Sequence, residues 1–145
     1  MVSSFVFEDI DRINELGTKL NPKFKELFHI DKLNSNEKIY VYKENNQILG
    51  FNHISINFEV VDLLNIIVDE KYRNKHIATL LMDYMITDLP NNVSRILLEV
   101  NKNNTAAIKL YYRFNFEVIN ERKKYYGSDN ALIMERNLLW KMYIY

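Results

Sequence analysis

The stretch from Arg73 to Lys75 places basic side chains just where the chain enters a helix. Before it, Leu63 to Val68 is a short apolar run bounded by Asp62 and Asp69, which predicts a strand buried on both faces. After it, apolar residues recur at helical spacing, at Ile77, Leu80, Leu81, Tyr84 and Met85. The first turn of a helix offers unpaired backbone N–H groups and the positive end of the helix dipole, which favour a phosphate group. The sequence therefore predicts a phosphate-binding turn, although an ordinary strand-to-helix turn with solvated basic residues fits the same spacing.

Length and composition limit the classes of protein to consider. A chain of 145 residues, 48% hydrophobic and 26% charged, is typical of one globular domain, which we expect over residues 1–138 with an apolar tail at residues 139–145. The formal net charge is zero, so no strong attraction to nucleic acid or to an anionic membrane is expected. The absence of cysteine excludes a disulfide, a thiolate metal site and a cysteine nucleophile, so a transferred group would pass directly to its acceptor.

Targeting and metal-binding signals are also missing from the sequence. The opening M-V-S-S-F-V-F-E lacks the basic start and apolar core of a signal peptide, and no apolar run approaches the roughly 18 residues of a membrane span. We therefore expect a cytoplasmic protein. The three histidines are scattered, without H-E-x-x-H or a comparable cluster, so no metal site is expected and His53, inside a predicted strand, is interpreted as structural.

The segments before the basic turn predict one strand, two helices and a pair of strands. Ser4 to Phe7 is the predicted first strand, and Asn45-Asn46 is a tight turn between strands at residues 39–42 and 48–57. Asp9 is a candidate N-cap for the first helix, and Asn21-Pro22 opens the second. The expected apolar faces of these helices are Ile10, Ile13, Leu16 and Leu20, then Phe24, Leu27 and Phe28.

The segments after the long helix repeat the strand-loop-helix pattern. Arg95 to Val100 is a predicted strand, and Asn103 or Asn104 is suited to N-cap a helix whose apolar face is Ala107, Leu110, Tyr111 and Phe114. Strands at residues 116–120 and 131–134 follow. The predicted order, β-α-α-β-β-β-α-β-α-β-β, indicates an α/β fold with a mixed sheet and helices on its faces.

The spelling of three segments resembles the GCN5-related N-acetyltransferase (GNAT) family. Arg73-x-x-His76-x-Ala78 resembles the acyl-CoA pyrophosphate loop, Q/R-x-x-G-x-G/A. Leu97 to Val118 resembles L-E-V-R-x-S-N-x-x-A-x-x-L-Y-x-x-x-G-F, and Glu121 to Glu135 resembles R-x-x-Y-Y…D-A-x-x-M. The combination is similar to the RimI-type enzymes, which acetylate the N-terminal alanine of a small-subunit ribosomal protein. The chain departs from these patterns at His76, Asn101 and Asn115, where the family has glycine, arginine and glycine.

The resemblance implies the GNAT fold, acetyl-CoA as co-substrate and no metal. It assigns the pyrophosphate to the loop and the first helical turn, at Arg73, Asn74, Lys75, His76, Ile77, Ala78 and Thr79. The backbone of Ile66, Ile67 and Val68 would pair with the pantetheine arm and face the oxyanion. Asn104 would contact the same arm, and N-capping explains this residue equally well. At position 76, a histidine in helical geometry would still offer its N–H to the pyrophosphate.

Acetyl transfer needs a neutral amine and a proton for the departing thiolate. An N-terminal amine, with a reference pKa of about 7.7 to 8.0 against about 10.4 for lysine, needs only a mild base. The resemblance implies that Glu99 is this base, directly or through a water, and that Tyr111 protonates the thiolate. Without the family, Glu99 is a solvated carboxylate at a strand end and Tyr111 is a core tyrosine, with Tyr112 as its rival. Tyr125 and Tyr126 would line the peptide groove, or serve only in packing.

These observations predict an acetyl-CoA-dependent N-acetyltransferase that acts on a protein N-terminal α-amine, such as the N-terminal alanine of a ribosomal protein. One alternative keeps the fold and changes the acceptor to a small amine or a lysine. Another is a non-catalytic CoA-binding sensor or interaction domain, which Glu99 and Tyr111 disfavour and His76 leaves open. The expected partner is an acceptor protein or peptide, and the chain is expected to be a monomer or a weak homodimer. The tail Leu139 to Tyr145 could lengthen the last strand, cover the core or contact a second subunit.

Overall fold

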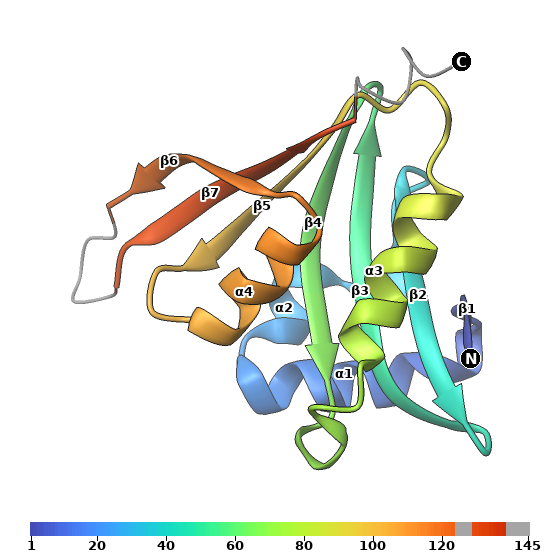
Figure 1. The fold of residues 1–145 in the computed structure, drawn as a ribbon. Helices are drawn as coiled ribbons and strands as arrows, with labels where there is room; N and C mark the ends of the chain where they lie inside the picture. The colour runs from blue at the N-terminus through green and yellow to red at the C-terminus, as the bar shows by residue number, and fades with distance from the viewer. Residues whose placement is uncertain (124–128, 139–145) are drawn as a thin grey trace. The chain divides into compact units, whose positions relative to one another are not determined.

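The computed structural model describes residues 1–123 and 129–138 (Figure 1). Within these residues, seven strands form a mixed sheet in the order β1-β2-β3-β4-β5-β7-β6. The strands and helices of the described residues follow the predicted order, which confirms the α/β fold. Three 3-10 turns, η1 to η3, lie between them. The elements are β1 (Val2–Ser4), η1 (Phe7–Asp9), α1 (Ile10–Leu20), α2 (Phe24–Phe28), η2 (Ile30–Lys32), β2 (Glu37–Glu44), β3 (Gln47–Asn57), β4 (Val60–Val68), η3 (Glu70–Tyr72), α3 (Ile77–Asp88), β5 (Arg95–Asn101), α4 (Thr105–Arg113), β6 (Glu117–Arg122) and β7 (Ala131–Asn137).

The chain packs as two compact units, and β4 contributes residues to both. The first unit comprises Met1–Ser55 and Asn65–Leu89, and the second comprises Ile56–Leu64 with the described part of Pro90–Tyr145. A single domain over residues 1–138 stays a prediction. The tail Leu139 to Tyr145 lies outside the described residues.

In the first unit, β1 to β4 lie between α1 and α2 on one face and α3 on the other (Figure 1). Ile13 and Leu16 of α1 and Phe24 of α2 join one core cluster with strand residues that include Phe51 and Ile67. The buried residues of α3 are Ile77, Leu81, Met82, Met85 and Ile86. Apolar side chains of the helices therefore pack on each face of this part of the sheet.

Gly17 makes room for α2 to pack on α1. A Cβ atom at this position would overlap the Phe24 ring, which is fully buried. Because any other residue would push the two helices apart, the glycine is a packing requirement and not only a weak point in the helix. The expected apolar faces are wrong at two positions: Leu20, the last residue of α1, and Leu27 are both exposed, and in α2 it is Phe24 and Phe28 that pack on the core.

Asn45 and Asn46 form the predicted turn between β2 and β3. Their φ angles are 50° and 64°, and Glu44 pairs with Gln47 across the two-residue connection. Asparagine tolerates this left-handed conformation better than most residues. The hairpin prediction is therefore confirmed.

The start of the chain differs from the prediction. β1 covers Val2–Ser4 instead of Ser4 to Phe7, because Asp9 Oδ2 accepts a hydrogen bond from Val6 N–H at 2.8 Å and the intervening residues turn into η1. Asp9 Oδ1 lies 2.9 Å from Lys43 Nζ, so this carboxylate does not cap α1. The second helix begins at Phe24, later than Asn21-Pro22 suggested.

The central strand and the helix after it are less buried than predicted. In β4, Val61, Leu63 and Ile67 are buried, but Leu64 is 38% exposed, so the strand is not covered on both faces. Alternate side chains of a strand point to opposite sides, and only one side of β4 is continuously packed. In α3, Leu80 and Tyr84 are exposed, because Met82 and Ile86 complete the buried face in their place.

In the second unit, β5 pairs in parallel with β4 from Val60↔Arg95 to Leu63↔Leu98, and antiparallel with β7. Asn104 is the N-cap of α4, and its Oδ1 accepts a hydrogen bond from Ala107 N–H at 3.2 Å, as predicted. The last two strands exist where expected but run further than predicted. Cross-strand pairing with β5 carries β7 as far as Asn137, and a bulge after Val118 shifts the register of β6.

Candidate functional site

The predicted phosphate-binding loop is an exposed turn between β4 and α3. The side chains from Arg73 to His76 are exposed, Ala78 and Thr79 are half-buried, and Ile77 is buried. Asn74 has a φ of 65°, and His76 has a φ of 62° with a ψ of 17°. His76 is therefore left-handed and not in the helical geometry that we expected. Its carbonyl accepts the hydrogen bond of Leu80 N–H at 3.0 Å, so the left-handed residue leads directly into the first turn of α3.

The basic side chains of this loop are available to an anion. Arg73 and Lys75 are both exposed, and Lys75 Nζ lies 5.4 Å from the centre of the Tyr72 ring. A cation over an aromatic face is held by a weak attraction that does not remove its charge. The loop thus combines two cations, unpaired N–H groups of a helix start and a backbone turn, which together suit a pyrophosphate.

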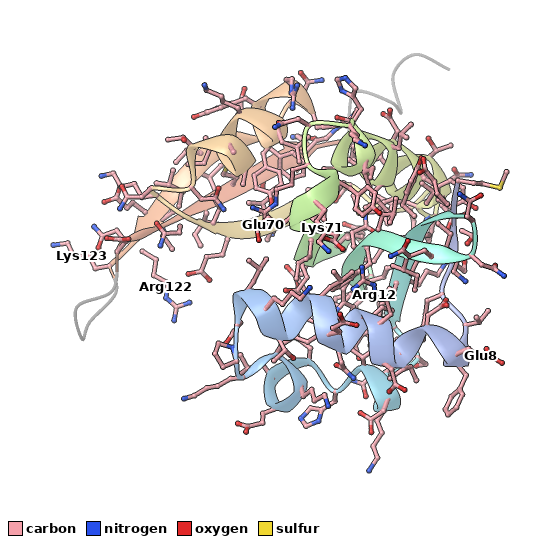
Figure 2. The ribbon with its side chains drawn as sticks, turned by 90° about the horizontal axis from the view of Figure 1, so that it is seen from below. Glu8, Arg12, Glu70, Lys71, Arg122 and Lys123 are labelled. Carbon is pink, nitrogen blue, oxygen red and sulfur yellow. The ribbon has the colours of Figure 1, made fainter. Side chains whose placement is uncertain are left out.

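The end of β4 is fixed by a network that sequence reasoning missed. Arg12 Nη2 of α1 lies 2.6 Å from Asp69 Oδ2, and Arg12 Nε donates to the carbonyl of Ile48 at 3.1 Å. Asp69 Oδ1 accepts from Lys71 N–H at 3.0 Å, and this hydrogen bond, together with the Arg12 guanidinium, lowers the pKa of the Asp69 carboxyl. Figure 2 labels Arg12, which comes from α1, and Lys71, which follows the end of β4. The strand is therefore joined to α1 at the residue where it leaves the sheet.

The predicted strand residues before this point differ in exposure. Ile67 is buried in the core cluster, whereas Ile66 and Val68 are half-buried. Gly50 of β3 lies beside them, since a Cβ there would be 3.0 Å from the carbonyl oxygen of Ile67 and 3.3 Å from a methyl group of Val68. The glycine allows β3 to approach the end of β4 closely.

The second unit holds the residues predicted for catalysis. Glu99 is exposed on β5, and its Oε2 lies 3.6 Å from Arg122 Nη1 of β6, a partner that the sequence did not reveal. Tyr111 is only 6% exposed and packs against Phe116, with ring centres 5.8 Å apart. Burial raises the pKa of Tyr111 to about 12. Tyr112 is 53% exposed, so the two neighbouring tyrosines have distinct surroundings, as their helical positions predicted.

The candidate residues thus fall into two local groups. Residues 66–68 and 73–79 form a continuous strand-loop-helix segment in the first unit. Glu99, Asn104 and Tyr111 follow one another on β5 and α4 in the second unit. Tyr125 and Tyr126 lie outside the described residues.

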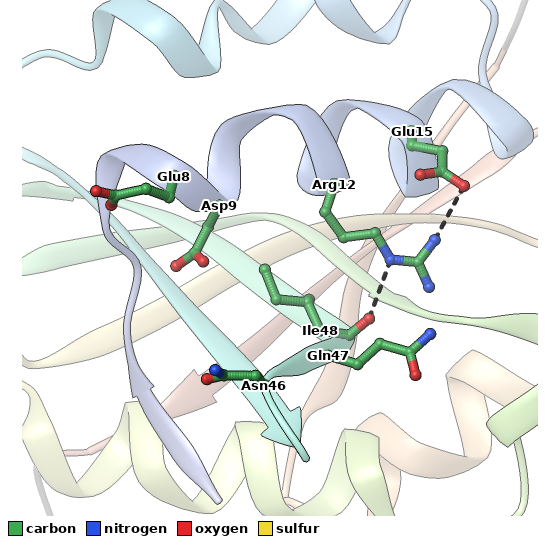
Figure 3. A pocket seen from close by; sticks show the side chains of 7 residues that line it. All are labelled: Glu8, Asp9, Arg12, Glu15, Asn46, Gln47 and Ile48. Carbon is green, nitrogen blue, oxygen red and sulfur yellow. Dashed lines mark hydrogen bonds and ion pairs between the residues drawn. The ribbon is translucent and has the colours of Figure 1, made fainter.

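A polar cavity of about 460 Å³ lies between the start of α1 and the hairpin of β2 and β3 (Figure 3). Its lining is Glu8, Asp9, Arg12, Glu15, Asn46, Gln47 and Ile48, none of which was predicted as a site residue. Arg12 is engaged with Glu15, Ile48 and Asp69, and Asp9 is paired with Lys43. Three of the four charged residues that line the cavity, Asp9, Arg12 and Glu15, therefore already have partners, and we assign the cavity no chemistry.

Two classes of site find no support within residues 1–123 and 129–138. No cluster of three or more His, Asp or Glu side chains is arranged to hold a metal ion there. In the same part of the chain, no helix is both long enough and apolar enough to cross a membrane.

Several known proteins that this chain resembles are named as acetyltransferases. The profile of the Acetyltransferase (GNAT) family matches residues 6–116. A ribosomal protein bS18-alanine N-acetyltransferase of Haemophilus ducreyi is 31% identical over 151 aligned positions, which cover 92% of this chain and 97% of that protein. An N-alpha-acetyltransferase of Saccharolobus solfataricus is 38% identical over 79 residues, 52% of this chain and about half (47%) of that protein. The crystal structure of the Escherichia coli ribosomal-protein-S18-alanine N-acetyltransferase shares the fold, with a TM-score of 0.86 and 23% identity over 95% of this chain and 93% of that one.

Proposed function

Because the chain belongs to the GNAT family of acetyltransferases, we propose that it transfers the acetyl group of acetyl-CoA directly to a protein N-terminal α-amine. The relative that spans nearly the whole chain is named for the alanine of ribosomal protein bS18, so an N-terminal alanine of a ribosomal protein is the proposed acceptor. The reaction would take place in the cytoplasm, where such acceptors are made. The proposed reaction uses no metal ion.

The conformation of His76 is the observation that carries the proposal. In the family pattern this position is glycine, which accepts a positive φ without strain. Here a histidine holds a φ of 62° directly before α3, so the chain keeps the backbone turn even though the glycine is gone. The exposed Arg73 and Lys75 add positive charge beside it. These residues fit the pyrophosphate of acetyl-CoA, whose thioester would supply the activated acetyl group.

Glu99 is the proposed base. Its exposed carboxylate can accept a proton from an α-amine directly or through a water, and an amine with a pKa of about 7.7 to 8.0 gives up that proton near neutral pH. Arg122 is 3.6 Å away and limits the directions in which the carboxylate can turn, although an exposed pair of this kind adds little stability. A lysine acceptor, with a pKa of about 10.4, holds its proton more strongly than an α-amine does and would need a stronger base.

Tyr111 is the proposed donor to the departing thiolate. Since burial raises its pKa to about 12, the hydroxyl keeps its proton throughout the physiological range. Complete transfer of that proton to a thiolate with a pKa of about 8.5 is uphill, so donation of a hydrogen bond is the larger part of its role. Its ring packs against Phe116, which restricts the orientation of the ring that carries the hydroxyl. The half-buried backbone of Ile66 and Val68 would supply donors for the charge that develops on the carbonyl oxygen.

Replacement of Tyr111 tests whether the chain catalyses or only binds CoA. Tyr111→Phe removes one hydroxyl and almost no volume, and no hydrogen bond of this hydroxyl is found within the described residues. We therefore expect unchanged or slightly higher stability and nearly unchanged CoA affinity. Turnover of an alanine-starting peptide should fall by about 10²- to 10⁴-fold, as is typical when a positioned acid is lost.

Tyr112→Phe is the matched control, because this neighbour is 53% exposed and points away from the buried face of α4. It should keep full turnover. Equal turnover of Tyr111→Phe and the natural protein would remove Tyr111 from the mechanism. Parallel losses of turnover and CoA affinity in both variants would show that these tyrosines serve packing only.

A further inference from the structure

We propose that Arg12 is a positioning residue that fixes the acetyl-CoA-binding loop at the point where the chain leaves β4. The inference rests on the proposed function, because it concerns the loop assigned to the pyrophosphate. It adds a residue from α1, far from the loop in sequence, that no motif of the chain indicated.

Arg12 reaches three different parts of the first unit with its guanidinium. Nε donates to the carbonyl of Ile48 on β3 at 3.1 Å, and Nη1 donates to Glu15 Oε1 at 3.1 Å, as the dashed lines of Figure 3 show. Nη2 donates to Asp69 Oδ2 at 2.6 Å. A planar guanidinium with several donors can hold such an arrangement, whereas a single ammonium group cannot reproduce it.

Asp69 connects Arg12 to the backbone at the point where the chain turns away from β4. Its carboxylate is nearly buried, with a side-chain exposure of 8%, and its second oxygen accepts from Lys71 N–H at 3.0 Å, the first turn of η3. Its own N–H donates to the carbonyl of Leu49 at 2.7 Å, and its carbonyl accepts from Tyr72 N–H at 2.9 Å. One residue therefore ends β4, caps η3 and receives the charge of Arg12.

The loop itself offers few other restraints. In the described chain, the side chains from Arg73 to His76 form no hydrogen bond, and Lys75 touches only the face of Tyr72. The far end is held by Ile77, which is 4% exposed and packs beside Gly50 of β3. The four exposed residues 73–76 are thus held at one end by the packed Ile77 and at the other by the contact of Asp69 with Arg12.

Loss of Arg12 would leave the Asp69 carboxylate nearly buried without its cation. Such a group turns toward water or takes up a proton, and either change weakens its hydrogen bond to Lys71 N–H. The loop would then populate conformations that do not bind pyrophosphate, and the apparent affinity falls by the fraction that remains competent. The chemistry of acetyl transfer, once acetyl-CoA is bound, would proceed as before.

The test compares Arg12→Gln with Glu15→Gln. Both remove one charge from the pair of Arg12 with Glu15, but only the first removes the contact with Asp69. We expect Arg12→Gln to raise the dissociation constant for acetyl-CoA, measured by calorimetry, by at least about tenfold, and Glu15→Gln to change it by less than about twofold. The turnover number at saturating acetyl-CoA, with an alanine-starting peptide, should change by less than about threefold in both variants.

Hydrogen exchange of the protein without ligand gives a readout that does not depend on catalysis. Backbone amides from Lys71 to His76 should exchange faster in Arg12→Gln than in Glu15→Gln, while those of α3 stay protected. Arg12→Lys should recover only part of the affinity. If Arg12→Gln does not fold, Asp69→Ala replaces it, since it removes both the contact with Arg12 and the oxygen that accepts from Lys71 N–H.

Unchanged affinity and unchanged loop exchange in Arg12→Gln, or in Asp69→Ala in its place, would overturn the inference. So would a loss of thermal stability without a change in affinity, since that result belongs to a purely structural ion pair. Failure of the natural protein to bind acetyl-CoA would instead refute the proposed function, and the exchange rates alone would then decide whether Arg12 fixes the loop.

Discussion

Replacement of His76 by glycine should stabilise the protein. His76 is exposed and has a φ of 62°, and a residue with a Cβ atom in this conformation is strained by roughly 1–2 kcal/mol. Glycine removes that strain but makes the unfolded chain more flexible, which costs about 0.4–1 kcal/mol. The difference is a gain of about 0 to 1.5 kcal/mol in the free energy of unfolding, measured by urea denaturation. Since the backbone turn is already present, CoA affinity measured by calorimetry should change by less than about tenfold, or 1.4 kcal/mol.

Lys75→Gly is the control within the same loop. Lys75 is not among the described residues with a positive φ, so glycine relieves no strain there and also removes the cation from the Tyr72 ring. This variant should lose about 1–2 kcal/mol through the more flexible unfolded chain and the lost contact. Equal destabilisation by His76→Gly and Lys75→Gly would refute the left-handed turn. A gain in CoA affinity well above tenfold in His76→Gly would mean that histidine impairs the natural site, which favours a non-catalytic protein.

Two further predictions concern packing and pH. Gly17→Ala should lower the free energy of unfolding by about 1–3 kcal/mol, because its Cβ would overlap the Phe24 ring. The control Thr18→Ala, at an exposed position of the same helix, should change it little. Equal stabilities of the two variants in urea would contradict the close approach of α1 and α2. Burial lowers the pKa of His53 below 6.5 although its Nε2 lies 2.8 Å from Glu37 Oε1, so the unfolded chain binds the extra proton more readily. The contribution of His53 to the free energy of unfolding is therefore complete above about pH 6.5. It is lost as the pH falls below that value, by at most about 1.4 kcal/mol per pH unit. His53→Gln should flatten this slope between about pH 5 and 6.5.

Features decided by neighbouring residues were predictable from the sequence. The turn at Asn45-Asn46 and the cap at Asn104 depend on side chains that favour one local conformation, and both predictions are confirmed. Features decided by distant packing were not. Whether Leu20 or Leu80 is buried depends on where its helix meets the sheet, and helical spacing alone does not contain that information.

The candidate site shows the same division. The strand-loop-helix segment followed from periodicity and from the resemblance to a known family, but the left-handed turn at His76 did not, because histidine itself does not demand a positive φ. The contact of Arg12 with Asp69 joins residues 57 positions apart, and each had an ordinary local explanation as a helix surface residue or a strand boundary. Long-range polar contacts of this kind need the folded structure to be seen.

The acceptor is tested most directly by the position of the acetyl group on a peptide. A peptide that begins with alanine and carries an internal lysine is incubated with the protein and acetyl-CoA, beside the same peptide with a blocked N-terminus and a polyamine, and the products are read by tandem mass spectrometry. We predict acetylation of the free α-amine alone, and no product from the blocked peptide. Acetyl on the lysine or on the polyamine would contradict the N-terminal acceptor, and no product from any acceptor despite measurable CoA binding would contradict catalysis itself.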